Sequence, residues 1–250
     1  MSFRSFFKSD LFKFFHTSVW IWHLVIPIAG AGMFLWYYSF SSMQEMDKVS
    51  LYIEVLSVTF PFVIGIVTGM VSQMEQNAAG SQLLLTTPTY KFFPHFCKLF
   101  VILLMGFSSS FLAFAFFGIG MGALGHTGLL LIFYVKLAVA LFLSMIPIYI
   151  IQYMVSFVWG NGYSIGLGIV GSLLCALLIT SLGDSSWWFL PWGIAARFSM
   201  TFFVANISDF PFFQYAYVKQ SVTALVLFVM VLVLLSGILL GRWEGRKTEN

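Results

Sequence analysis

The sequence predicts an all-α integral membrane protein with six transmembrane helices, and three observations support this fold class. Of the 250 residues, 60% are hydrophobic and only 8% carry a charge, whereas about a quarter of the residues in soluble domains are charged. The mean hydropathy is +0.95. Six apolar stretches are each long enough to cross about 30 Å of hydrocarbon as a helix. The length leaves no second soluble domain with a core of its own.

The predicted spans lie within a single transmembrane domain that covers residues 1–250. The fourth span is the longest and has room to tilt or to kink at Pro147. The six spans cover residues 18–40, 52–73, 97–122, 129–159, 163–182 and 221–240.

Lysine and arginine residues predict that both termini are cytoplasmic, because positive charge concentrates on the inner side of a membrane. With this orientation the outer side holds Lys48, Arg197 and Lys219, with Lys136 near the outer end of the fourth span. The inner side holds eight basic residues, namely Arg4, Lys8, Lys13, Lys91, Lys98, Arg242, Arg246 and Lys247.

Two segments outside the spans are rich in aromatic residues. Residues 1–15 place Phe3, Phe6, Phe7, Leu11, Phe14 and Phe15 near helical spacing, which indicates an amphipathic helix on the inner surface or a basic flank that only fixes topology. Residues 183–220 contain Pro191 and Pro211 and are too interrupted to span. We expect a pair of short re-entrant or interfacial helices there, because tryptophan and tyrosine favour the headgroup layer.

Glycine pairs four residues apart predict close helix packing. The fifth span adds Gly168 and Gly171, so it is the span best suited to tight contact. Packing inside one chain and packing between subunits both fit the pattern. The pairs are Gly65 with Gly69, Gly118 with Gly122, and Gly162 with Gly166.

Ionisable residues within membrane segments are functional candidates by default. Glu54 and Lys136 lie near the predicted outer surface, where their side chains can reach the headgroups, and His23 fits a packing role. Cys97 and Cys175 read as buried thiols. No chain of Asp, Glu or His residues crosses the membrane, and no catalytic cluster, metal-ligand spacing or nucleic-acid footprint occurs. These observations disfavour a proton-coupled carrier and a membrane enzyme acting on lipids.

The polar stretch at residues 72–96 lies between the second and third spans, on the predicted cytoplasmic side. Residues 75–85 can form a short helix with Glu75 near its start, where the helix dipole favours an anion. Three clustered leucines would give this helix an apolar face, and Pro88 would end it. Such a helix is suited to docking in a groove of a soluble partner.

The pattern EQNAAGSQLLLTTPTYK resembles the acidic–Gly–Leu–Leu–Pro signature that follows the second span in type-2 ABC exporter permeases. The resemblance extends over six spans, this loop and the long outer segment between the fifth and sixth spans. The motif WWFLPWGIAAR and the chain length resemble lantibiotic-immunity ABC transporter permeases of the MutE/EpiE/NisE group. The basic residue that often follows the proline is displaced to Lys91. The matching signature positions are Glu75, Gly80, Leu83, Leu84 and Pro88.

The resemblance implies a permease subunit of the bacterial cytoplasmic membrane that removes a lantibiotic-like cationic peptide from the producer. It implies a coupling helix that contacts an ABC ATPase, present in two copies, and a second six-span permease or a second copy of this chain. The chain has no phosphate-binding loop, so ATP and Mg²⁺ are expected on the ATPase. The expected peptide-receiving surface, which an ordinary aromatic belt would also explain, comprises Trp187, Trp188, Pro191, Trp192 and Arg197. Alternatives are another cargo, such as a bacitracin-like antibiotic or a lipid, and a membrane assembly protein without transport.

Overall fold

The computed structural model describes residues 3–77 and 92–243, and in these ranges the chain forms helices and short turns but no strand. Six helices in these ranges are long and apolar enough to cross a membrane, which supports a multi-pass membrane protein. They are α2 (Val19–Tyr38), α3 (Glu45–Asn77), α5 (Phe92–Ala123), α6 (Leu131–Val158), α7 (Asn161–Ile179) and α9 (Val218–Gly241). Two shorter helices, α1 (Phe3–Phe15) and α8 (Pro191–Ile207), accompany them.

The six predicted spans coincide with these six helices, but α3 and α5 are longer than their apolar stretches. Helix α3 begins at Glu45 rather than at residue 52, and α5 begins at Phe92 rather than at residue 97. The first turn of α3 carries Glu45 and Asp47, and acids in the first turn are favoured by the helix dipole. The added turns at the starts of these helices are therefore continuous with the apolar spans and extend the bundle.

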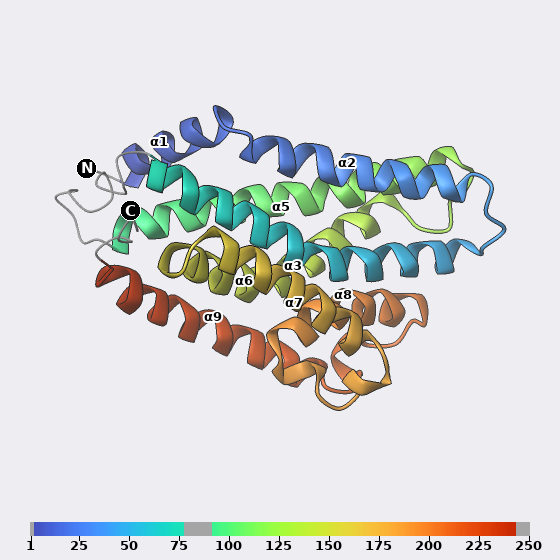
Figure 1. Cartoon of the computed structure of the whole chain (residues 1–250). Helices are drawn as coiled ribbons and strands as arrows, with labels where there is room; N and C mark the ends of the chain where they lie inside the picture. Colours follow the sequence, from blue (N-terminus) through green and yellow to red (C-terminus); the bar gives the residue numbers. More distant parts are fainter. Residues whose placement is uncertain (1–2, 78–91, 244–250) are drawn as a thin grey trace.

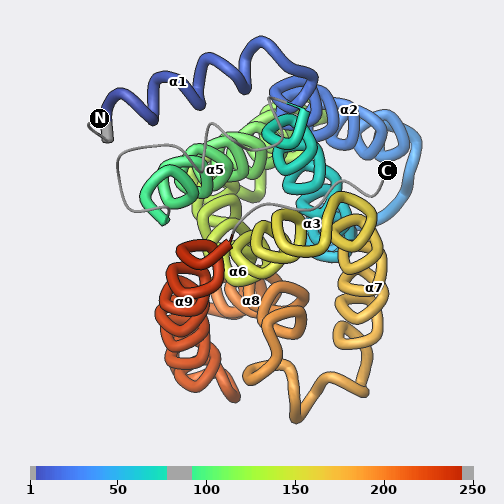
Figure 2. Tube along the Cα trace, turned by 60° about the vertical axis from the view of Figure 1, so that its left-hand side comes forward, coloured from blue at the N-terminus to red at the C-terminus, as the bar shows by residue number. Residues whose placement is uncertain are grey.

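The helices form one elongated bundle in which α3, α5 and α6 are central (Figures 1 and 2). Helix α3 packs against α6 and α7, α2 packs chiefly against α5, and α9 packs against α6 and α8. Both ends of the described chain lie at the same end of the bundle (Figure 1). Below, this end is called the termini end, and the opposite end is called the far end.

Helix α1 lies beside α5 and the start of α2 at the termini end (Figure 2). Its buried side chains are Phe6, Asp10 and Phe14, spaced four residues apart on one face. Phe15, expected on the apolar stripe, is instead exposed. The apolar stripe thus exists, and a carboxylate lies in the middle of it. The charged partner of this carboxylate is described below.

Of the six glycines in the predicted pairs, three pack against another helix of the same chain. Helices α3 and α7 lie close together at Gly65 and Gly69: a Cβ atom on Gly65 would lie 2.6 Å from the backbone oxygen of Ser164, and one on Gly69 would meet Asn161. Gly118 lies against the Tyr134 ring. The outward-facing members, without a neighbour within 4 Å of an added Cβ, are Gly122, Gly162 and Gly166.

The segment between α7 and α9 is organised by a single α-helix and not by a pair of helices. Helix α8 begins at Pro191, where proline lacks only an N–H that would have no partner in the helix. It packs against α6, α7 and α3, and three-residue 3-10 turns precede and follow it. Two phenylalanines on α8, Phe198 and Phe203, are buried, so this helix belongs to the bundle core at the far end.

Candidate functional site: a buried charge cluster at the termini end

Four charged side chains from three helices meet at the termini end. Lys98 Nζ on α5 donates to Glu75 Oε1 on α3 at 2.8 Å and also to Asp10 Oδ1 on α1. Lys13 Nζ, on the next turn of α1, donates to the same Glu75 oxygen at 2.9 Å. Below, this group is called the four-charge cluster. It joins α1, α3 and α5 through two acids and two bases, so its formal charge is zero.

The cluster is buried, so the free energy of its ion pairs depends on the cost of removing the charges from water. The Lys98 side chain is 0% exposed and the Glu75 side chain 1%, whereas Lys13 is 32% exposed. Removing charges from water costs several kcal/mol per ion, and mutual attraction recovers this cost only when the geometry is good. Every member must therefore keep its partner, and the ends of α1, α3 and α5 are held in one arrangement.

The sequence pattern predicts a separate short helix with Glu75 near its start. In the structure Glu75 does not begin a separate helix. Helix α3 continues through Glu75 to Asn77, so the residue occupies the last turn of a long membrane helix. The cluster supplies the physical reason, because Lys98 and Lys13 compensate a carboxylate that would otherwise have to reach water. Its second oxygen, Oε2, is buried without a hydrogen-bond partner among the described residues. The other signature positions lie outside the described residues: Gly80, Leu83, Leu84 and Pro88.

Sequence reasoning missed the partnership of Asp10 with Lys98. The sequence predicts only an orienting role for Lys98 and no role for Asp10. The usable signal was that an acid in the middle of a buried helix face needs a base from elsewhere in the fold. The sequence does not tell which base, because Asp10 and Lys98 are separated by 88 residues.

An aromatic cluster lies next to these charges and connects α5, α6 and the end of the described chain. His95 Nδ1 lies 3.0 Å from the hydroxyl oxygen of Tyr153. The His95 ring also makes edge-to-face contacts with Phe157 and Trp243, at centroid distances of 4.8 and 5.7 Å. Trp243 lies two residues after the last residue of α9, Gly241, so the last described residues are packed against the same end of the bundle.

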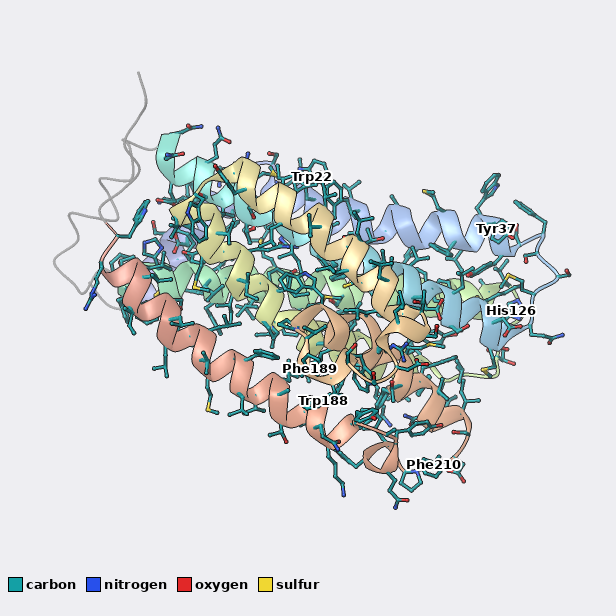
Figure 3. The ribbon with its side chains drawn as sticks, turned by 60° about the horizontal axis from the view of Figure 1, so that its bottom comes forward. Trp22, Tyr37, His126, Trp188, Phe189 and Phe210 are labelled. Carbon is teal, nitrogen blue, oxygen red and sulfur yellow. The ribbon has the colours of Figure 1, made fainter. Side chains whose placement is uncertain are left out.

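The predicted peptide-receiving residues do not form one exposed surface. Trp187 is buried, and Trp192 lies beside Gly171 of α7. Trp188 is half-buried and stacks on Tyr217 at 6.3 Å. Figure 3 shows Trp188 near Phe189, and Phe210 further along the segment. The aromatic residues of this segment therefore divide between core packing and a partly exposed group.

Arg197, another residue of the predicted peptide-receiving surface, caps the C-terminal end of α7. Its guanidinium donates to the carbonyl oxygens of Leu178 and Ile179 at 2.6 and 3.0 Å, to that of Thr180, and to Asp184 Oδ1 at 2.7 Å. The last carbonyls of a helix have no partners within the helix. A cation at this position also complements the helix dipole.

Arg197→Lys is expected to lower the melting temperature of the purified protein by about 5 °C, because one ammonium cannot reach three carbonyls and a carboxylate together. Melting in detergent at a fixed heating rate measures the effect. Asp184→Asn is the matched control, since it leaves the three carbonyl bonds in place and should lower the melting temperature less. Equal melting of Arg197→Lys and the unaltered protein would contradict the capping role.

The other candidate ionisable residues lie apart from one another. Glu54 is half-buried on the wall of a cavity of about 210 Å³ that Arg197 and Tyr215 also line, and Lys136 is exposed. Lys48, assigned from the sequence to the outer flank, is buried at the far end. Its Nζ donates to Tyr38 O at 3.2 Å and lies 2.9 Å from His126 Nε2.

No group of three or more His, Cys, Asp or Glu side chains able to hold a metal ion occurs in residues 3–77 and 92–243. The two cysteines are free and buried, and the thiol of Cys175 donates to the carbonyl of Trp192 at 3.3 Å.

The fold and the four-charge cluster together define an all-helical, multi-pass membrane protein with an ion-paired end. No model of a protein family matches the chain, and no curated protein and no solved structure matches it either.

Proposed function

We propose that the chain is the membrane-spanning subunit of an ATP-driven exporter that removes a lantibiotic-type antimicrobial peptide from the membrane of the producing cell. The observation that carries the proposal is the position of the four-charge cluster. It locks the last turn of α3, and α3 ends at Asn77, three residues before the Gly–Leu–Leu–Pro part of the signature begins at Gly80.

The cluster supports transmission of force from the termini end into the bundle. A push on the segment between α3 and α5 would act on two helix ends that Glu75 and Lys98 tie together. Because Asp10 and Lys13 belong to the same cluster, α1 would move with them. Helices that are joined by buried ion pairs shift as one body rather than bending separately, since separating the charges leaves them unpaired in an apolar environment.

The far end supports the cargo side of the proposal. Glu54 provides one carboxylate on a cavity of about 210 Å³, close to the aromatic segment around α8. A cationic, amphipathic peptide in the lipid headgroup layer needs an acidic contact and aromatic rings that tolerate both lipid and charge. The predicted ATPase partner would bind at the termini end, so energy input and cargo would be at opposite ends of the bundle.

The docking claim is best tested in the segment that carries the signature, because substitution of buried Glu75 would also break the four-charge cluster. In cells that co-express this chain with the proposed ATPase and second permease, Leu84→Glu is expected to abolish co-purification of the ATPase. A charged residue would disrupt an apolar docking face. Leu124→Glu, at an exposed position between α5 and α6, is the matched control at the far end and should leave assembly intact.

The same strains report on the cargo. Sensitive cells that express the complete set are expected to survive a lantibiotic challenge, and cells with Leu84→Glu are not. A parallel challenge with bacitracin separates the two kinds of cargo. Unchanged co-purification and ATP hydrolysis in Leu84→Glu would contradict the docking claim. Equal lantibiotic sensitivity with and without the set would contradict the immunity function.

A further inference from the structure

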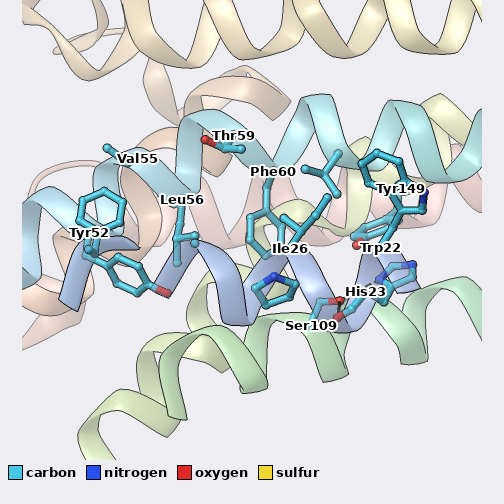
Figure 4. A pocket seen from close by; sticks show the side chains of 14 residues that line it. Trp22, His23, Ile26, Tyr52, Val55, Leu56, Thr59, Phe60, Ser109 and Tyr149 are labelled. Carbon is cyan, nitrogen blue, oxygen red and sulfur yellow. Dashed lines mark hydrogen bonds between the residues drawn. The ribbon is translucent and has the colours of Figure 1, made fainter. Parts of the chain in front are cut away.

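A cavity of about 210 Å³ at the far end has an acid and a base on its wall that do not pair with each other. Glu54 of α3 and Arg197 of α8 both line it, together with Thr201, Tyr215 and four apolar residues. Below, it is called the Glu54 cavity. Figure 4 shows a different cavity, of about 110 Å³ between α2 and α3, whose wall contains no Asp, Glu, Lys or Arg side chain. Opposite charges therefore distinguish the Glu54 cavity from the one in Figure 4.

The contact between α3 and α7 gives the depth of Glu54 in the bundle. The two helices run antiparallel, with Gly65 against Ser164 and Pro61 against Gly168. The same register places Glu54 about one turn before the end of α7. Because α7 is long and apolar enough to cross a membrane, its end marks the membrane boundary, and Glu54 lies in the headgroup layer just inside it.

The Glu54 carboxylate has no charged partner in this environment. No hydrogen bond or ion pair to it occurs among the described residues, and its oxygens retain accessible surface. The guanidinium of Arg197 is on the same cavity wall, but its Nε and Nη2 atoms donate to the end of α7 and to Asp184. An unpaired acid at membrane depth is costly. A cation from outside the chain would therefore be favoured at Glu54.

Arg197 supplies the second half of the site. Its Nη1 atom donates to no acceptor among the described residues and retains accessible surface, so two N–H groups are left for an anion. Guanidinium groups are well suited to phosphate oxygens, because their donors are fixed in a planar fork. A ligand that matches the cavity therefore carries a cation for Glu54 and a phosphate for Arg197.

We propose that the Glu54 cavity binds the headgroup of an aminophospholipid, whose primary ammonium donates to the Glu54 carboxylate and whose phosphate accepts from Arg197 Nη1. A lysine side chain of a peptide supplies the ammonium but no phosphate, and a choline headgroup has no N–H to donate. An apolar cavity of about 150 Å³ holds one benzene molecule, so a cavity of about 210 Å³ has room for the ammonium end of the headgroup. The acyl chains would lie among the membrane lipids.

This site goes beyond the exporter function proposed above, because it requires only this chain and a lipid. A cationic peptide that used Glu54 would first have to displace the lipid ammonium. The experiments on this site contain neither the ATPase nor the second permease, so the lipid site and the exporter function can fail separately.

The test measures binding of three lipids with identical acyl chains to the full chain in detergent by native mass spectrometry. The lipids are phosphatidylethanolamine, phosphatidylcholine and phosphatidylglycerol. We expect phosphatidylethanolamine to bind about tenfold more tightly than either of the others, the effect of one charge-assisted hydrogen bond. Glu54→Gln should remove this preference. Asp47→Asn, which removes an exposed acid from the same helix, is the matched control and should retain it.

A second pair of variants, on α8, locates the bound headgroup. Val204 lines the Glu54 cavity, whereas Ile207 is similarly exposed on the same helix and does not line it. Val204→Trp should fill the cavity and lower the affinity for phosphatidylethanolamine to that for phosphatidylcholine. Ile207→Trp adds the same side chain outside the cavity and should leave the preference unchanged.

A diacyl lipid with a primary ammonium but no phosphate tests the role of Arg197, and it should bind about fivefold more weakly than phosphatidylethanolamine. Equal binding of these two lipids would overturn the phosphate contact. Equal binding of the three phospholipids to the unaltered protein, or an undiminished preference in Glu54→Gln or Val204→Trp, would overturn the proposal. Glu54-dependent binding of a lysine-rich peptide, without any preference among the lipids, would assign the cavity to a peptide and also overturn it.

Discussion

Lys98→Met is expected to destabilise the protein by about 3–5 kcal/mol, which corresponds to a fall in melting temperature of about 10 °C. Lys98 is the base shared by both acids of the four-charge cluster, with Glu75 Oε1 at 2.8 Å. Without it, Asp10 loses the cation it pairs with and Glu75 keeps only the partly exposed Lys13. Methionine fills the volume, so the expected loss comes from uncompensated burial of charge and not from a cavity.

Three further variants separate this explanation from a general sensitivity of α5. The triple change Asp10→Asn, Glu75→Gln and Lys98→Met removes the unpaired charges and should recover much of the stability, because replacing a whole buried ion group is often close to neutral. Lys13→Met should cost at most about 1 kcal/mol, as expected for a partly exposed ion pair. Lys136→Met, at an exposed position on α6, controls for the loss of one lysine. A triple variant that melts no higher than Lys98→Met would refute the electrostatic account.

Gly65→Leu is expected to separate α3 from α7 and to cost about 3 kcal/mol or more, at the upper end of overpacking effects. Its Cβ atom would lie 2.6 Å from the backbone oxygen of Ser164 and 3.2 Å from the Cα atom of Gly168. Neither backbone atom can move aside as a flexible side chain would. The hydrogen bonds that join the two helices here, from Ser164 Oγ to Gly65 O and between the Ser164 and Thr68 hydroxyls, would be lost with the contact.

Gly166→Leu is the matched control for Gly65→Leu, because it lies on the facing helix, belongs to the same kind of glycine pair, and has nothing within 4 Å of an added Cβ atom. We expect it to leave the melting temperature within about 2 °C of the unaltered protein. The two variants are compared by melting in detergent and by recovery after purification. Equal melting of Gly65→Leu and Gly166→Leu would contradict the assignment of the close contact to Gly65.

The outward members of the glycine pairs show why the sequence left two interpretations open. Gly65 and Gly166 both belong to a pair with four-residue spacing, and the spacing says only that two small residues share a helix face. Which face is turned inward depends on how each helix is rotated against its neighbours. The bundle turns Gly65, Gly168 and Gly171 inward and turns Gly162 and Gly166 outward.

The fold class and the six spans could be predicted from the sequence because they depend on local hydrophobicity and length. An apolar stretch of about 20 residues has to form a helix in lipid, whatever surrounds it, since unpaired backbone groups there cost several kcal/mol each. The helix over residues 3–15 could also be predicted from local sequence, because its apolar side chains recur near helical spacing. The break between α7 and α9 could be predicted because prolines interrupt that aromatic segment. The continuation of α3 through Glu75 was not, because it depends on bases that lie far away in the chain.

The sequence by itself thus determined that the protein belongs in a membrane and that six of its helices are long and apolar enough to cross it. It also determined the few positions where polar residues interrupt the apolar stretches. Only the tertiary structure decided what those interruptions do. Asp10, Glu75 and Lys98 are unremarkable as letters, yet they become one buried cluster because three helix ends converge. His23 likewise obtains a polar partner from another helix, because the hydroxyl of Ser109, 86 residues away in the chain, lies 2.8 Å from its Nδ1 atom. Partnership between distant polar groups depends on packing geometry, and that geometry is not encoded within any one segment.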